Sequence, residues 1–418
     1  MKAILFSIGT RGDIEPFLSI AELLRDKNWE VFCVFPEQFR ETVEEMGIPF
    51  QGFTRDFLDM MNSEEAKKFM GGHGSFIQRI QYFIKMARMG IKHSKEMTLL
   101  QHQIQINKNP DKIFYHPKCN IALIWSITHP GKSIMVSPIP FMTHPIDHLS
   151  PLGGHYGKYM NRLSTWLINT IKAVVIKRVS MPYIKDYGIN NIAISEIKKA
   201  MLNTEKTLYT ISPSLFPRPD YWPPVAKVVG YYERDKTTHW QPSLPLLKFI
   251  EEHSKIVFIT FGSMINANPI KTTSILMDVL NKHNIAAIIN TSWGGIVKPD
   301  THTDNIFFVA NIPYDWAFSK MYAVVHHGGS GTTHTALKYG CPSLIVSHVL
   351  DQPFWSKTIS DLKLGPEGIP VKKLAKDIFE YKLKDLLTNE VYKKNAEMIS
   401  KKIKSESNKE YLYGEIIS

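Results

Sequence analysis

The fold is decided by one stretch of the chain, residues 323–347, which reads AVVHHGGSGTTHTALKYGCPSLIVS. An apolar run leads into two histidines and a glycine-rich segment, and a segment that can form a helix follows. Gly340 is placed to end this helix, and Pro342 precedes a second apolar run at Leu344–Val346. The stretch therefore predicts a strand, a glycine loop, a helix and a second strand, which together make one βαβ unit.

The glycine loop has the chemistry of an anion site. Its glycines allow tight backbone angles and a close approach to a ligand, and its hydroxyl side chains offer hydrogen bonds and an N-cap. These residues are Gly328, Gly329, Ser330, Gly331, Thr332 and Thr333. Free amides and the dipole at a helix N-terminus attract negative charge. A phosphate is the favoured ligand, although glycines at this spacing also serve simple tight turns.

Asp351 and Gln352 follow the second apolar run, so we expect both at the carboxyl-end rim that also holds the glycine loop. A carboxylate beside an amide both accepts and donates hydrogen bonds, which suits the hydroxyls of a hexose. Such a pair taken alone is more often a turn. Together with the glycine loop, it predicts a site for a phosphorylated sugar.

The chain opens with another βαβ pattern. The expected elements are a strand at 3–8, a helix at 17–25 and a strand at 31–35. The segment Gly9–Pro16, which reads GTRGDIEP, lies in the expected loop after the first strand. A dinucleotide fingerprint needs three glycines there, and only Gly9 and Gly12 are present, which disfavours an NAD-dependent oxidoreductase.

A chain of 418 residues is too long for one hydrophobic core of ordinary size. Prolines crowd residues 213–245, which we interpret as a linker. The βα alternation restarts after it, with strands at 256–261, 286–290 and 306–309 and a helix at 275–281. We predict an α/β protein of two Rossmann-like domains, residues 1–235 and 236–418, whose last helix can pack back on the N-terminal domain.

Composition narrows the class of protein. Hydrophobic residues make up 44% and aromatic residues 11% of the chain, which excludes a disordered or fibrous protein. Cys33, Cys119 and Cys341 are widely spaced among apolar residues, which favours structural thiols in a reducing compartment over a disulfide or a metal site. The apolar N-terminal run is too short for a signal peptide or a membrane span, so we expect a cytoplasmic protein.

The net charge of +11 favours acidic partners: a pyrophosphate donor, an anionic membrane surface or a nucleic acid. The sign of the charge does not choose among the three. Part of the charge comes from lysines near the C-terminus, such as Lys394, Lys401 and Lys404, for which a solvated helix face is the simplest explanation.

Residues 306–370 resemble the donor-binding signature of the UDP-sugar glycosyltransferases in glycosyltransferase family 1. The sterol glucosyltransferases and the bacterial natural-product glycosyltransferases are the most similar. The resemblance implies the GT-B fold, in which two Rossmann-like domains face each other across a cleft. It also implies that His326 contacts the donor phosphates, and that Asp351 and Gln352 bind the sugar hydroxyls. The residues implied to hold the pyrophosphate are Gly328, Ser330, Gly331 and Thr332.

The resemblance extends to three further segments of the donor half. Ser263, in the strand-end turn FGSM (261–264), matches a serine that contacts the donor in the family. Ile312, in NIPYDW (311–316), is implied to bind the base through its backbone, although Asn311 and Tyr314 depart from the pattern of plant members. Trp293 borders the base or serves as a core or lid residue.

Asp13 occupies the place at which the sterol and antibiotic glycosyltransferases carry a proposed catalytic base, whereas many relatives have histidine there. Gly12, beside it, is implied to contact the donor. An ordinary aspartate, with a pKa of about 3.9, is a weak base toward an alcohol. The alternative is that Asp13 only caps the helix that we expect to start near Pro16. His129, His144, His148 and His155 are candidates to assist it.

The resemblance implies an inverting transfer of a hexose, with glucose the expected sugar, from a UDP-sugar to a hydroxyl group. It implies no metal ion and no other cofactor. Methionines and aromatic residues at 57–105 favour a lipophilic acceptor such as a sterol or a natural product, with core packing as the alternative. We expect no nucleic-acid partner, and the basic surface allows peripheral contact with a membrane. The alternatives are a UDP-sugar epimerase-like GT-B enzyme and a non-catalytic protein that binds nucleotide sugars or lipids.

Overall fold

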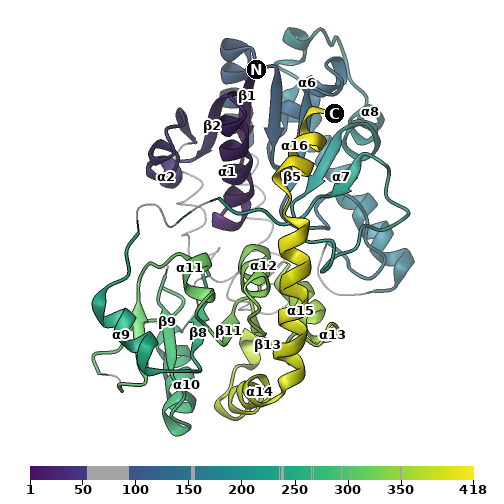
Figure 1. Cartoon of the computed structure of the whole chain (residues 1–418). Coiled ribbons are helices and arrows are strands. Elements are labelled where there is room, and N and C mark those ends of the chain that lie inside the picture. Colours follow the sequence, from purple (N-terminus) through teal and green to yellow (C-terminus); the bar gives the residue numbers. More distant parts are fainter. Residues whose placement is uncertain are drawn as a thin grey trace. The chain divides into compact units, whose positions relative to one another are not determined.

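The protein is described from a computed structural model. The described residues are 1–53, 94–151, 156–234, 236, 240–264, 266, 268–292, 294–301, 303–348 and 351–418. They divide into two compact units. The described residues of unit 1 lie within Met1–Ser63, Ile80–Arg234 and Glu406–Ser418, and those of unit 2 lie within Asp235–Ser405. Each unit is built on its own sheet (Figure 1).

The sheet of unit 1 has seven strands in the order β3-β2-β1-β4-β5-β6-β7, and every neighbouring pair is parallel. The strands are β1 (Lys2–Phe6), β2 (Glu30–Pro36), β3 (Phe50–Phe53), β4 (Lys112–Tyr115), β5 (Ser133–Ser137), β6 (Lys206–Tyr209) and β7 (Ala226–Val228). Helices cover both faces, so the central strands are buried almost throughout and consist of apolar runs rather than alternating ones. This explains why the strands could be recognised from short apolar segments.

The sheet of unit 2 has six strands in the order β10-β9-β8-β11-β12-β13, again all parallel. The strands are β8 (Val257–Thr260), β9 (Ala287–Asn290), β10 (Ile306–Val309), β11 (Ala323–His326), β12 (Ser343–Ser347) and β13 (Ile369–Pro370). Both orders run outward from a first strand in two directions, as in Rossmann folds. The predicted α/β class with two such domains is confirmed.

Helices connect the strands in both units. Those of unit 1 include α1 (Arg11–Asp26), α2 (Arg40–Glu45), α6 (Ile121–Thr128), α7 (Lys158–Ser180), α8 (Ile194–Lys199) and α16 (Lys409–Ile417). Those of unit 2 include α9 (Leu244–Glu252), α10 (Pro269–Lys282), α11 (Tyr314–Phe318), α12 (Ser330–Lys338), α13 (Gln352–Asp361) and α14 (Lys376–Thr388), followed by α15 (Glu390–Glu406). Short 3-10 or π turns lie at Glu37–Phe39, Ile184–Tyr187, Ala200–Thr204 and Val371–Lys373. No helix in the described ranges has the length and apolarity needed to cross a lipid bilayer.

One expectation about local structure was wrong, and another was incomplete, because the predicted linker contains the boundary between the units and also a strand. Helix α1 begins at Arg11 rather than near Pro16, because Thr10 and Asp13 form a capping box that nucleates the helix earlier. The proline-rich segment taken as a linker contains β7, whose backbone pairs with β6. Prolines there end and turn the chain without preventing a short edge strand.

The chain returns to unit 1 at its C-terminus. Helix α16 lies beside α1 in the yellow end of the ribbon (Figure 1), and Leu412 and Ile416 belong to the same core cluster as the apolar face of α1. At the start of this return, the Glu406 carboxylate accepts hydrogen bonds from the hydroxyls of Ser212 and Ser214. A carboxylate with two hydroxyl donors anchors the last thirteen residues, Glu406–Ser418, to unit 1.

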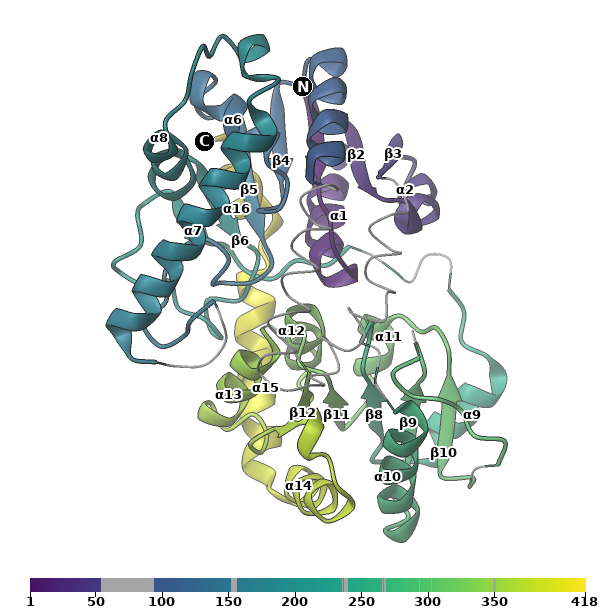
Figure 2. The same cartoon turned by 180° about the vertical axis from the view of Figure 1, so that it is seen from behind.

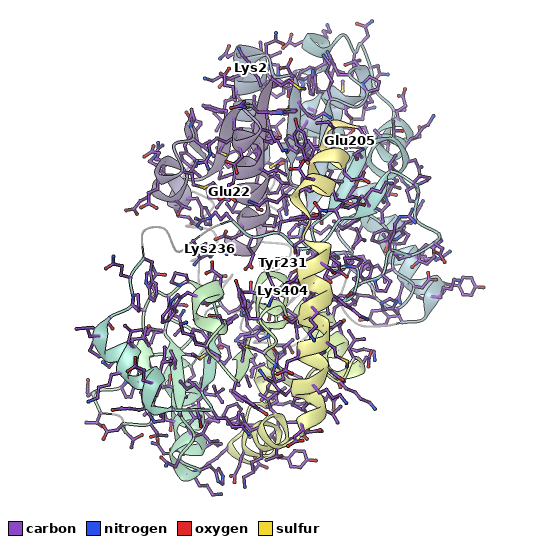
Figure 3. The ribbon with its side chains drawn as sticks, in the orientation of Figure 1. Lys2, Glu22, Glu205, Tyr231, Lys236 and Lys404 are labelled. Carbon is purple, nitrogen blue, oxygen red and sulfur yellow. The ribbon has the colours of Figure 1, made fainter. Side chains whose placement is uncertain are left out.

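Unit 1 buries a carboxylic acid at Glu205, which Figure 3 labels. Burial raises the pKa of Glu205 from its ordinary 4.5 to about 8, against the lowering effect of the nearby hydroxyls of Ser126, Ser133 and Tyr115. The two serine hydroxyls also donate to the carbonyl groups of Leu123 and Ala122 in α6, which limits how far they compensate the carboxylate for its burial. The folded protein therefore favours the neutral acid.

We predict that Glu205 makes stability depend on pH. Its folded-state pKa is raised, so its stabilising contribution is complete below pH 4.5 and is lost as the pH rises through about 8. Glu205→Gln, which stays neutral, should lack this loss and gain about 2 to 4 kcal/mol relative to the wild type between pH 5 and 9. Urea unfolding across this range measures it. The control Glu251→Gln changes an exposed carboxylate and should follow the wild type. Parallel pH dependence in Glu205→Gln and the wild type would contradict the prediction.

Candidate functional site

Each sheet reverses its strand order beside its first strand. In unit 1 the reversal lies between β1 and β4, and in unit 2 it lies between β8 and β11. The connections leave these two strands in opposite directions, which opens a crevice at their carboxyl ends where ligands bind in folds of this kind. His326 and the glycine loop lie at the reversal in unit 2, and Asp13 lies at the reversal in unit 1.

In unit 2, β11 ends at His326 and α12 begins at Ser330, with Gly331 and Thr332 in its first turn. The N-cap is Gly329 rather than one of the hydroxyl residues that we expected. A residue from another part of the chain takes the capping role instead. Oδ2 of Asp351 accepts a hydrogen bond from the Ser330 amide at 3.2 Å, as an N-cap side chain would. The amides of this first turn point out of the helix N-terminus, where they favour an anion.

His326 is fully buried and its protonation state is fixed by its neighbours. The Gly328 amide donates to Nδ1 of His326 at 3.0 Å, so Nδ1 carries no hydrogen and Nε2 does. Burial lowers the pKa of His326 to about 3, so the ring is neutral. Within the part of the chain that the structure describes, the buried Nε2 has no hydrogen-bond partner. His326 therefore presents one unused N–H donor at the carboxyl end of β11.

His327, to which the sequence analysis assigned no role, fills the space between two loops. A Cβ atom added to Gly262 would lie 2.8 Å from its ring, and one added to Gly329 would lie 2.5 Å from its Nε2. Burial lowers the pKa of His327 well below the ordinary value, so this ring is neutral as well. The loops after β8 and β11 are thus separated by the thickness of one imidazole ring, and both glycines are needed for that approach.

Asp351 and Gln352 are largely occupied within the protein. Oδ2 of Asp351 also accepts from the indole N–H of Trp355 at 3.0 Å. The Gln352 oxygen accepts from the His348 amide at 2.6 Å, and its Nε2 lies 3.2 Å from the Met264 sulfur. The pair therefore ties the start of α13 to the loops after β11, β12 and β8. Its role in binding sugar hydroxyls stays a prediction.

The segment implied to hold the base contains Ile312, whose side chain is buried. Its backbone N–H and C=O have no hydrogen-bond partner among the described residues. Tyr314 departs from the family pattern, and its hydroxyl is bonded to the Thr260 hydroxyl at 2.7 Å. This bond holds α11 against the end of β8 and so positions the segment. Ser263 is half-buried in the loop after β8, and Trp293 lies outside the described residues.

In unit 1, Gly12 and Asp13 lie in the first turn of α1 rather than in a loop. Oδ2 of Asp13 accepts from the Thr10 amide at 2.8 Å, so the capping role considered for Asp13 exists. Gly9 has a φ of +142°, and a Cβ there would lie 2.0 Å from Oδ2 of Asp13. The carboxylate therefore packs directly on the Gly9 backbone, which only glycine permits.

The second oxygen of Asp13 faces a histidine that the sequence analysis missed. Nε2 of His116 lies 3.2 Å from Oδ1 of Asp13, and Nζ of Lys118 lies 3.7 Å from it. The Lys118 amide donates to Nδ1 of His116, so the ring hydrogen is on Nε2. This N–H group does not point straight at the Asp13 carboxylate, and Nε2 therefore makes no hydrogen bond within the described residues. The available signal was the apolar run 113–115 directly before His116. This run lies in β4, the neighbour of β1.

These contacts determine the charges around Asp13. Burial raises its pKa, but Lys118, His116 and the Thr10 amide outweigh burial and hold the pKa of Asp13 well below its usual range. Burial lowers the pKa of His116, against the opposite effect of Asp13, so the ring is neutral beside an ionised carboxylate. Oδ1 of Asp13 is therefore a charged acceptor, and the Asp13 side chain is 17% exposed.

Two of the histidines that we named as candidates to assist Asp13, His144 and His129, have other partners. His144 bonds to the Tyr209 hydroxyl and the Leu202 carbonyl oxygen in the core. His129 stacks on Trp125, and His155 lies outside the described residues. Most of the methionine-rich and aromatic segment falls in residues 54–93, which also lie outside the described residues. All three cysteines are buried free thiols.

Two family models cover much of the chain. Residues 3–108 match the glycosyltransferase family 28 N-terminal domain, and residues 277–415 match the C-terminal domain described as erythromycin biosynthesis protein CIII-like. The crystal structure of the glycotransferase of kitacinnamycin aligns over 98% of this chain and 96% of its own, with a TM-score of 0.70 and 14% identity. The chain has the GT-B glycosyltransferase fold. The predicted resemblance is therefore confirmed.

Curated relatives are similar to this GT-B chain over nearly its whole length. Two sterol 3-beta-glucosyltransferases of Arabidopsis thaliana are 28% identical over 97% of the chain and 29% identical over 94% of it. The chain spans 63% and 64% of the length of these two relatives.

We predict that Gly328→Ala disrupts the donor loop. Gly328 has a φ of +90°, and an added Cβ would lie 2.6 Å from Cγ2 of Ile345 in β12. The strained backbone and the overlap together should destabilise the protein by about 2 to 4 kcal/mol, measured as a lower urea midpoint. Gly414→Ala is the control, because Gly414 lies in α16 with nothing within 4 Å of its added Cβ. Equal midpoints for the two variants would contradict the close approach.

Proposed function

We propose that the protein is an inverting glycosyltransferase that moves a hexose, glucose in the first instance, from a UDP-sugar to a hydroxyl of a lipophilic acceptor such as a sterol. The curated relatives, which are sterol 3-beta-glucosyltransferases, support this substrate class. The observation that carries the proposal is the unused N–H of His326 at a glycine loop and helix N-terminus.

The donor half of the proposal rests on hydrogen bonding in a dry site. A buried donor without a partner costs about 1 to 3 kcal/mol, which a phosphate oxygen bound to Nε2 of His326 would recover. The first-turn amides of α12 add the partial positive charge of a helix N-terminus. Because neutral donors and a helix dipole supply this stabilisation, the proposed transfer needs no metal ion. The charge that develops on the leaving UDP is stabilised by groups already in position.

The base in the proposal is Asp13, acting through Oδ1. As the acceptor oxygen bonds to the anomeric carbon, its O–H bond breaks and the proton passes to Asp13. The bond from the anomeric carbon to the phosphate oxygen breaks, and its electron pair leaves with UDP. His116 and Lys118 keep Asp13 ionised at the start of this step. The low pKa makes Asp13 a weak base, so proton transfer must follow bond formation, when the acceptor hydroxyl has become acidic.

We predict that two substitutions separate the two roles. Asp13→Asn keeps an oxygen for the Thr10 amide but cannot take a proton, so transfer should fall by about 10²- to 10⁴-fold with UDP affinity unchanged. His326→Ala should weaken UDP binding by about tenfold or more, the loss of one hydrogen bond to a charged group. Calorimetry with UDP, and mass detection of glycosylated sterol from UDP-glucose, measure the two effects.

The controls are Asp26→Asn, at the exposed end of α1, and His253→Ala, directly after the end of α9. Both should behave as the wild type, and the wild-type rate should survive EDTA. Unchanged transfer in Asp13→Asn would remove the base assignment, and unchanged UDP affinity in His326→Ala would remove the phosphate assignment. Formation of an isomerised UDP-sugar without glycosylated acceptor would favour an epimerase-like enzyme instead.

We also predict that Lys118 determines the acid limb of the pH profile. Lys118 is the strongest of the charges that lower the pKa of Asp13. In Lys118→Met, the pKa of Asp13 should rise, so that kcat/KM begins to fall at a higher pH than in the wild type as the solution is acidified. Lys118→Arg keeps the charge and should retain the wild-type profile. If kcat/KM of Lys118→Met falls at the same acidic pH as that of the wild type, Asp13 is not the titrating base.

A further inference from the structure

Helix α7 exposes an apolar stripe along its length. Seven of its large apolar side chains are between 45 and 84% exposed. They are Tyr159, Met160, Leu163, Trp166, Leu167, Ile171 and Val174, and we call them the α7 stripe. At 100° per residue they fall within an arc of about 140° and extend over about 22 Å. Figure 2 shows α7 on the near side of the unit 1 sheet.

The inward face of α7 is polar from Asn161 to Asn169, where a core helix is usually apolar, and it becomes apolar only at Ala173, Ile176 and Val179. Nδ2 of Asn161 donates to the Asp147 carbonyl at 2.8 Å, and Nδ2 of Asn169 donates to the Thr143 carbonyl at 2.7 Å. Thr165, between them, is buried as well. Turning the helix to bury its apolar stripe would break both of these buried bonds. The outward position of the stripe is therefore held by specific contacts.

The surroundings of the stripe are positively charged. Helix α7 has no acidic residue, and of its five basic residues Lys158 and Arg162 pair with Asp147 while Lys172 is bonded to the Met142 carbonyl, which leaves two beside the stripe. Lys177 and Arg178 lie in its last turn, on the side of the stripe. From the neighbouring helix α8, Nζ of Lys198 lies 4.4 Å from the centre of the Trp166 ring. The surface thus combines an apolar, aromatic strip with cations at its edge.

We propose that the α7 stripe is a docking surface for an anionic phospholipid bilayer. Large apolar side chains that are exposed along one face of a helix can mark an interaction site in proteins. Aromatic and aliphatic residues beside lysine and arginine are the composition of helices that lie in the interface of a membrane. Negative lipid headgroups attract the flanking cations, which gives the charge complementarity that selects this occupant. One face of α7 is held by unit 1, so the helix lies on the bilayer surface.

The docking surface is independent of the transferase chemistry, because none of the stripe residues belongs to the donor or base sites described above. It deepens the proposed function in one respect, since it would bring unit 1 to the phase in which a lipophilic acceptor dissolves. Binding to vesicles without donor or acceptor tests the surface alone. Its failure is therefore distinguishable from a failure of the proposed activity.

The experiment measures sedimentation of the full chain with vesicles of phosphatidylcholine alone or with 30 mol% phosphatidylserine, a composition chosen here to give about one anionic lipid in three. We expect binding to the anionic vesicles and weakening by salt. The triple variant Leu163→Ser, Trp166→Ser and Leu167→Ser should lower the partition coefficient at least tenfold. The pair Lys177→Glu and Arg178→Glu should abolish the preference for anionic lipid.

The matched controls lie in unit 2. Leu244→Ser, Ile270→Ser and Tyr381→Ser remove three side chains that are more exposed than those of the triple variant, and Lys401→Glu with Lys402→Glu reverses two charges on α15. Both controls should bind within twofold of the wild type. Thermal unfolding confirms that each variant is folded. Wild-type binding by the triple variant would overturn the proposal. So would a dimer in sedimentation equilibrium that the triple variant dissolves, because a second copy would then cover the stripe.

Discussion

The donor half of this protein depends on the parallel pairing of β8 with β11. These strands are far apart in sequence, and their pairing brings the loop after Thr260 against the loop after His326. His327 then fills the gap, and the two glycines beside it leave just enough room for its ring. The amides, the helix N-terminus and the unused N–H of His326 meet only because the strand order reverses here. The same reversal between β1 and β4 brings His116 to Asp13 in unit 1.

Desolvation determines how both sites are charged. In unit 2 it keeps His326 and His327 neutral, so the site offers hydrogen-bond donors without the cost of burying full charges. In unit 1 the same effect would neutralise Asp13, but Lys118, His116 and the Thr10 amide reverse it. A buried carboxylate is retained only where charges and donors compensate for lost water. The same charges and donors make the Asp13 carboxylate a weak base, which limits when in the reaction Asp13 can accept a proton.

Helix α7 shows the opposite use of side-chain polarity. Its amides are buried against backbone carbonyl groups of unit 1, and its largest apolar groups face outward. A helix in a globular protein normally reverses this pattern, because burial of apolar area is the main favourable term in folding. The pattern is therefore informative about what the outer face contacts. Helix α7 gives unit 1 an apolar surface with basic residues at its edge. The net charge of the chain could not show where such a surface lies.

The sequence by itself determined the βαβ alternation, the glycine loop at His326 and the place of Asp13 after the first strand. These features depend on apolar spacing and backbone freedom over a few residues, which the order of residues expresses directly. Only the tertiary structure decided that Asp351 caps α12, that β7 extends the sheet through a proline-rich segment, and that His116 lies beside Asp13. Each of these joins segments far apart in the chain, and their adjacency follows from strand order and packing. No local pattern encodes such long-range contacts, because they form only when the separate elements pack into one core.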